Sequence, residues 1–119
     1  MKPHRNLNAW RDGIDLVKDI YAITRGFPKE ERYEITSQLR RSVLSIPLNI
    51  AEGAARTSPK EFVRFLDIAI GSFAELDTLC LICYELKFII EANFSNLNDK
   101  LEVVGKLVFG LKRKLLSSI

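Results

Sequence analysis

The sequence predicts an all-α protein, an antiparallel up-and-down four-helix bundle, and three observations favour this fold class. Four stretches of the chain place apolar residues at spacings of three and four, which is the period of an amphipathic helix. Short segments that contain helix start and stop signals separate these stretches. Strand-like alternation of useful length is absent from the sequence. A chain of 119 residues is long enough to bury one core, so we expect a single domain over residues 1–119.

The first helix is expected over Asn8–Thr24 and ends at Gly26 and Pro28. Proline is tolerated in the first turn of a helix, so Pro28 can open the second helix, which is expected to run to about Ala55. Three glutamates near its start suit the positive end of the helix dipole. They are Glu30, Glu31 and Glu34.

The third helix begins at a strong start signal, in which Ser58 caps, Pro59 takes the first position and Glu61 completes a capping box. It is expected to extend to about Glu91, and its apolar arc is wider than a bundle core requires, which favours a subunit interface. The fourth helix is expected after Asn93-Phe94-Ser95 and carries an apolar seam with alternating spacings of four and three. This seam consists of Leu97, Leu101, Val104, Val108, Leu111 and Leu115.

One polar stripe runs along the second predicted helix, between wide apolar faces that favour self-association. The stripe is either a binding surface or part of an interior network of hydrogen bonds. We favour the network, because buried polar groups are normally paired with one another. Its expected members are Arg41, Asn49, Glu52 and, on the third helix, Glu75.

The two cysteines, Cys80 and Cys83, have C-x-x-C spacing but lie deep within a predicted helix, whereas a redox pair normally sits at a helix start. A zinc site would need two further ligands, and His4 is the only histidine. We therefore expect buried core thiols, no metal and no cofactor. The paired carboxylates lie on solvent faces or in a first turn, whereas acid or base catalysis needs an enclosed site, so no enzyme is predicted.

A formal net charge of +3 and an isoelectric point near 9.0 would help the protein approach phosphate groups. Cations near the end of the fourth helix, at residues 112–114, are favoured by the helix dipole in any case. No recognition motif for a particular base sequence is evident, so contact with the nucleic-acid backbone is the most that the pattern predicts. The predicted phosphate contacts are Arg40, Arg41, Arg56, Lys60 and Arg64.

The amino-terminal segment is charged and lacks the apolar run of a signal peptide, and no stretch approaches the roughly 20 apolar residues that span a bilayer. We therefore expect a protein of the cytoplasm with no membrane partner.

Several motifs occur here in an order that resembles a bacterial four-helix-bundle family, the proteins encoded in intervening sequences of 23S rRNA genes and often labelled ribosomal-protein-like. The match covers about Leu7 to Ile90, and the Asn49-Ile50-Ala51-Glu52-Gly53 segment makes it specific. The other segments are Leu7-Asn8-Ala9-Trp10, Phe27-Pro28-Lys29-Glu30-Glu31, Gln38-Leu39-Arg40-Arg41-Ser42, Arg56, Phe62-Val63-Arg64-Phe65-Leu66, and Ala69-Ile70-Gly71-Ser72 with Glu75.

This resemblance implies an up-and-down bundle that assembles as a homopentamer. It also implies kinship with the accessory variability proteins of diversity-generating retroelements, which are basic pentamers that bind a reverse transcriptase and nucleic acid. We therefore predict a non-enzymatic homo-oligomer that binds structured RNA or DNA, such as ribosomal RNA, through a composite basic surface. The alternative is a scaffold that recruits a protein partner and ignores nucleic acid.

Overall fold

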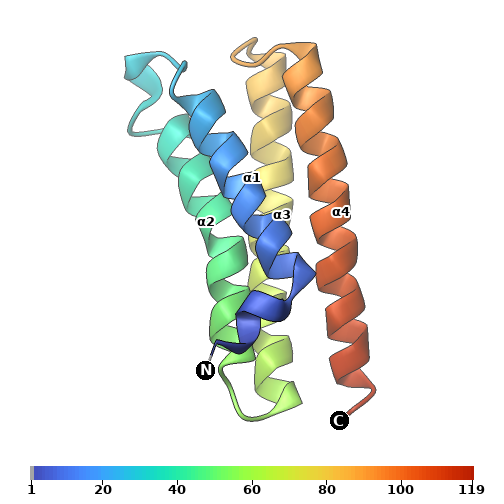
Figure 1. Ribbon diagram of the computed structural model, residues 1–119. Helices are drawn as coiled ribbons and strands as arrows, with labels where there is room; N and C mark the ends of the chain where they lie inside the picture. The colour runs from blue at the N-terminus through green and yellow to red at the C-terminus, as the bar shows by residue number, and fades with distance from the viewer. Residues whose placement is uncertain (1) are drawn as a thin grey trace.

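Figure 1 shows the computed structural model, which describes residues 2–119, as long helices standing side by side. The long helices are α1 (Asn8–Thr24), α2 (Ile35–Ala54), α3 (Pro59–Glu85) and α4 (Glu91–Leu116), and two short 3-10 helices, η1 (Pro3–Asn6) and η2 (Lys29–Glu31), precede α1 and α2. Successive helices pack against each other, and α1 also packs on α4, which closes the ring of helices around one core. The predicted all-α up-and-down four-helix bundle is confirmed, as a rod about 45 Å long.

The core is aliphatic and draws on all four helices, as the periodicity predicted. Each fully buried Leu, Ile or Val contributes roughly 1.5–3 kcal/mol relative to an exposed position. The predicted seam of α4 is buried at its first four positions and half-buried at the last two. The largest fully buried aliphatic side chains are Leu16, Ile20, Val43, Ile46, Ile50, Leu66, Leu76, Leu97, Leu101 and Val104.

The start of α2 differs from the prediction. Lys29–Glu31 forms one short 3-10 turn, and the α-helix begins only at Ile35. The segment from Pro28 to Glu34 offers only Tyr33 as an apolar side chain, and Tyr33 remains 86% exposed. Little core burial is therefore available to stabilise a helix over these residues, and helices in proteins depend on such packing.

The turn between α3 and α4 also lies elsewhere than predicted, at residues 86–90 instead of 93–95. Lys87 adopts a positive φ of 64°, its amide donates to the Tyr84 carbonyl, and the Phe88 amide donates to the Cys83 carbonyl at 2.8 Å. These two bonds make the Schellman motif that ends many helices. The reversal turns Phe88 back onto Phe27, with ring centroids 5.5 Å apart.

Close approach between helices depends on two glycines. A β-carbon added to Gly53 on α2 would lie 2.7 Å from the Phe62 ring and 2.9 Å from the Phe65 β-carbon on α3. A β-carbon added to Gly105 on α4 would lie 2.8 Å from the Phe73 ring. The missing side chains allow the aromatic residues of α3 to lie directly against both neighbouring helices.

Candidate nucleic-acid interface

Charge is segregated along the long axis of the bundle. Both chain termini and the turn between α2 and α3 lie at one end of the rod (Figure 1). The half of the molecule at this end comprises residues 2–12, 47–71 and 106–119 and is called the basic end below. It contains ten Lys and Arg residues against four Asp and Glu, whereas the other half contains eight against eleven. The formal net charges are thus +6 and −3.

Three of the predicted phosphate contacts gather at the basic end, around the turn between α2 and α3. The guanidinium groups of Arg56 and Arg64 lie over the same aromatic ring, that of Phe65, at 4.7 Å and 5.4 Å from its centroid. Lys60 is exposed one turn before Arg64 on α3. Stacking on an aromatic face restrains the two arginines while leaving their outer edges open to solvent.

The local sequence explains why this turn is well defined. Ser58 caps α3, since its hydroxyl accepts a hydrogen bond from the Glu61 amide at 3.2 Å, and Pro59 occupies the first helical position. The Glu61 carboxylate also accepts from the Arg64 Nε at 3.2 Å. The predicted cap is therefore confirmed, and it orients the first turn of α3 that carries Lys60 and Arg64.

Arg40 is placed differently. Its Nε donates to the Thr24 hydroxyl at 2.9 Å, and its guanidinium lies 4.5 Å from the centroid of the Tyr21 ring. Both partners belong to α1, so Arg40 ties α1 to α2 and does not share a surface with Arg56. Arg40 and Arg41 point in different directions because successive helical residues lie about 100° apart, and a phosphate contact at Arg40 stays a prediction.

Arg41 lies near the middle of the rod, apart from the cluster at the turn. It lines a polar groove of about 290 Å³ between α2 and α3. At the floor of this groove, the Ser72 hydroxyl donates to the Ser45 hydroxyl at 2.7 Å, which links the two helices. The remaining lining residues are Gln38, Ser42 and Glu75.

The predicted network of Arg41, Asn49, Glu52 and Glu75 is not buried within one chain. Only Asn49 is partly buried and hydrogen-bonded among the four, because its amide donates to the Ser45 carbonyl at 2.8 Å and to the Ser45 hydroxyl at 2.9 Å. Arg41, Glu52 and Glu75 are exposed. The stripe lies over the joint between α2 and α3, and no further helix of the described chain covers it.

The cations at the end of α4 were not among the predicted phosphate contacts, because their position beside the start of α3 depends on the packing of the helices. Lys112 on α4 forms an ion pair with Asp67 on α3 at 2.7 Å, which places the end of α4 beside the start of α3. Arg113 and Lys114 follow and are exposed. An antiparallel topology, applied to the charge pattern, could have found this convergence.

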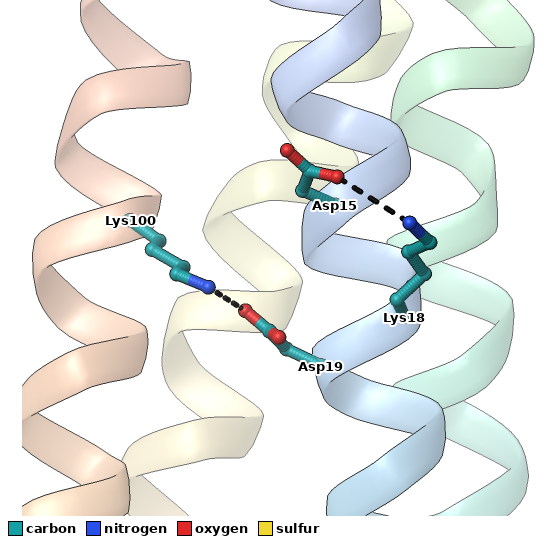
Figure 2. Close-up of polar contacts among 4 residues, drawn as sticks. All are labelled: Asp15, Lys18, Asp19 and Lys100. Atoms are coloured by element: carbon teal, nitrogen blue, oxygen red, sulfur yellow. Dashed lines mark hydrogen bonds and ion pairs between the residues drawn. The ribbon is translucent and has the colours of Figure 1, made fainter.

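The other half of the rod carries acidic side chains on α1 and α4. Figure 2 shows Lys100 of α4 paired with Asp19 of α1, a contact that fixes the two helices at one height, whereas Lys18 reaches Asp15 on its own helix at 3.8 Å. The Asp15–Lys18 pair is largely exposed and therefore contributes little to stability. Lys100 contributes to the packing of α1 on α4 instead of to the basic end.

The cysteines are buried core thiols, as predicted, and they remain unpaired. Burial raises the pKa of Cys80 to about 12 and that of Cys83 to about 11. The nearby thiol of Cys83 and carboxylate of Asp77 add to the effect at Cys80. Raised pKa values keep both thiols protonated and unreactive at neutral pH.

Within residues 2–119, no group of three or more His, Cys, Asp or Glu side chains is arranged to hold a metal ion. None of the helices described over this range has both the length and the apolarity needed to cross a membrane.

The fold and the charge pattern together define an α-helical up-and-down bundle with a basic end. The family model described as "23S rRNA-intervening sequence protein" matches residues 5–110, and the chain belongs to this family. The resemblance inferred from the sequence motifs is thereby confirmed for the family, while kinship with the retroelement accessory proteins stays a prediction.

A solved structure has the same fold. It is the crystal structure of a protein of unknown function from the S23 ribosomal protein family of Bacteroides thetaiotaomicron. The two chains superpose with a TM-score of 0.82 at 19% sequence identity, over 95% of this chain and 99% of the other. No curated protein matches the sequence.

Proposed function

We propose that this protein is a non-enzymatic homo-oligomer of the cytoplasm that binds structured RNA or DNA through its basic end. The observation that carries the proposal is the net charge of +6 on one half of the rod, with Arg56, Lys60 and Arg64 gathered at its turn. Such a surface attracts phosphate groups by releasing the counterions condensed on nucleic acid.

The contacts suit a nucleic-acid backbone and not a particular base sequence. Arginine presents several donors in a planar fork that matches a phosphate, and Arg56 is held in place by the Phe65 ring. The turn carries no pattern of side chains that would read base edges in a groove. Affinity should therefore depend on the shape and charge of the nucleic acid, and ribosomal RNA is a suitable class of ligand.

Self-association is supported by the exterior of α3. Residues 68–84 contain only two charged side chains, Glu75 and Asp77, yet Ile68, Leu81 and Ile82 are 40–48% exposed. Helix α3 thus exposes several large apolar side chains on a surface with few charges, which favours a protein interface. The family resemblance implies a pentamer, in which five basic ends would act together and strengthen binding.

The test is binding of a fluorescently labelled stem-loop RNA and a matched DNA duplex across a salt series. We expect log Kd to rise linearly with log salt, with a slope that reports several released counterions. The variant Arg56→Glu with Lys60→Glu should weaken binding and lower the slope by about one for each lost contact. The matched control Arg32→Glu with Lys87→Glu changes two exposed cations of the other half and should leave binding nearly unchanged.

The second candidate is a protein-interaction scaffold that does not bind nucleic acid, and the exposed apolar side chains of α3 favour it as well. Two results would favour the scaffold over nucleic-acid binding. The variant Arg56→Glu with Lys60→Glu would bind RNA and DNA as tightly as the wild type, or the wild type would bind neither at low salt.

A further inference from the structure

Two aromatic side chains are exposed within residues 2–119, and their electrostatic surroundings are opposite. Tyr33 is 86% exposed, but its segment also carries three glutamates, Glu30, Glu31 and Glu34. Phe109 is 48% exposed and belongs to the part of α4 that lies at the basic end (Figure 1). Single-stranded nucleic acids bind where bases stack on aromatic rings and cations attract the phosphates. Of the two exposed rings, Phe109 is therefore the one suited to a base.

Two exposed cations lie one turn of α4 before and after Phe109. Lys106 precedes the ring by about 4.5 Å along the helix axis, and Arg113 follows it by about 6 Å. The ion pairs within residues 2–119 include neither of these cations. Lys112, in contrast, is paired with Asp67 of α3 at 2.7 Å. Two cations about 10 Å apart along the axis thus remain available for phosphate groups on either side of the ring.

These side chains occupy one exposed strip of α4, called the Phe109 strip below, which consists of Lys106, Phe109, Gly110 and Arg113. Lys106 and Arg113 are offset from Phe109 in the same direction around the helix, by about 60° and 40°, so they form a line beside the ring. Gly110 lies on the other side of this line. Apart from the backbone of its own helix, no atom lies within 4 Å of the position that its β-carbon would occupy. The surface beside the two cations is therefore low, which lets a nucleotide backbone approach α4 closely.

We infer that the Phe109 strip binds an unpaired stretch of RNA or DNA, in which a base stacks on Phe109 while the neighbouring phosphates contact Lys106 and Arg113. The inference rests on the proposed function and names the class of ligand, a nucleic acid with single-stranded nucleotides. Stacking on a side chain needs an open base face, which a base inside a duplex does not offer. A purely electrostatic surface would instead favour the duplex, because the duplex carries more charge per unit length.

The Phe109 strip and the cations of the turn between α2 and α3 can engage one ligand together. The ion pair of Lys112 with Asp67 places the end of α4 beside the start of α3. Arg113 follows Lys112 by one residue and Arg64 precedes Asp67 by three, so the antiparallel helices carry both arginines at nearly the same height. A hairpin whose stem lies on the turn can thus extend an unpaired tail along α4. Every base has a face that can stack, so the site should accept many sequences.

Two labelled RNA hairpins with the same stem test the inference, one blunt and one with a short tail of unpaired adenosines. We expect the wild type to bind the tailed hairpin more tightly than the blunt one, as measured by fluorescence anisotropy. Phe109→Leu keeps an apolar side chain but removes the ring. It should lower the affinity for the tailed hairpin by roughly 5- to 100-fold and leave the affinity for the blunt hairpin nearly unchanged. Phe109→Tyr keeps the ring and should bind both hairpins as the wild type does.

A salt series separates stacking from charge. Stacking releases no counterions, so Phe109→Leu should lower the affinity for the tailed hairpin equally at every salt concentration, whereas Arg113→Gln should reduce the salt slope by about one. Two controls are matched to Phe109. Tyr33→Leu removes the other exposed ring, and Leu116→Ala removes a side chain of the same helix that is 47% exposed. Both controls should bind the tailed hairpin as the wild type does. All these positions are exposed, so circular dichroism should show the same helix content in every variant.

The outcomes separate the inference from the proposed function. A wild type that binds neither hairpin at low salt overturns the proposed function and this inference with it. A wild type that binds both hairpins equally, or a Phe109→Leu variant that keeps the preference for the tail, overturns the inference and leaves the proposed function standing. An equal loss in Leu116→Ala also overturns it, because the effect would then be one of apolar surface and not of an aromatic ring. A changed sedimenting mass in Phe109→Leu has the same consequence, since the ring would belong to a contact between copies.

Discussion

The turn between α2 and α3 and the turn between α3 and α4 reverse the chain by different means. The first, at residues 55–58, depends on side chains, because Ser58 caps α3 and Gly53 admits the Phe62 and Phe65 side chains. The second, at residues 86–90, depends on backbone hydrogen bonds around Lys87, which adopts a positive φ without being glycine. A turn built from caps can be recognised in a sequence, whereas a turn built from backbone geometry alone leaves little trace.

The largest expected effect is at Gly53. Substitution by alanine places a β-carbon within 2.9 Å of Phe62 and Phe65 and forces α2 and α3 apart, so we expect a loss of about 1–3 kcal/mol in the free energy of unfolding. Urea denaturation at equal protein concentrations measures this loss. Gly110→Ala is the control, because apart from the adjacent backbone of its own helix no atom lies within 4 Å of the added β-carbon, and it should gain up to about 1 kcal/mol. Equal effects of the two substitutions would contradict the close contact at Gly53.

The cap at Ser58 should matter next. Ser58→Ala removes the acceptor of the Glu61 amide and should cost about 1 kcal/mol of unfolding free energy, while Ser58→Asp should retain most of the stability. Ser95→Ala, at an exposed position inside α4, provides the comparison and should have little effect. If Ser58→Ala were as mild as Ser95→Ala in the same denaturation experiment, the turn would not depend on its cap.

A smaller effect of opposite sign is expected at Lys87. Glycine reaches a positive φ without the steric cost that a β-carbon imposes, so Lys87→Gly should raise the free energy of unfolding by about 0.5–1 kcal/mol. In contrast, Lys106→Gly places glycine inside α4 and should lower it by roughly 1 kcal/mol. Thermal unfolding of both variants checks the signs, and a destabilised Lys87→Gly would count against the Schellman geometry.

The smallest expected effect concerns the buried thiols near the turn between α3 and α4. It is absent at neutral pH and appears only at alkaline pH. Burial raises the pKa of Cys80 from 9.0 to about 12 and that of Cys83 to about 11. The unfolded chain therefore loses these protons first, so the thiols should not affect stability below pH 9 and should lower it progressively between pH 9 and 12. The Cys80→Ala variant should show a shallower decline than the wild type. At pH 8, a thiol reagent should label the folded protein only as fast as it unfolds.

Much of the fold could be predicted from the sequence because periodicity reports burial directly. Leu97, Leu101 and Val104 were assigned to the core by spacing alone, and they are buried. The boundaries of the helices could be predicted less well. Nothing in the residues before Ile35 distinguishes a charged helical turn from a charged loop, and the reversal at Lys87 is unusual for a residue with a side chain.

Proximity among the candidate phosphate contacts could be predicted only for residues that are close in sequence. Arg56, Lys60 and Arg64 flank one turn, so their proximity follows from the cap at Ser58. Arg40 and Arg41 are adjacent in sequence but point in different directions, and only the packing of α1 decides that Arg40 contacts Thr24 and Tyr21. The burial of a polar stripe likewise depends on which surfaces cover it, and that information lies outside the stripe.

The separation of charge along the rod also gives the molecule a large electric dipole moment. In the field of a polyanion, such a dipole experiences a torque before any contact forms, so the chain would approach with its termini and the Arg56 turn leading. The acidic half is meanwhile repelled, which disfavours sideways encounters. With the proposed function, productive collisions would thereby be enriched, and added salt should slow association more than it speeds dissociation.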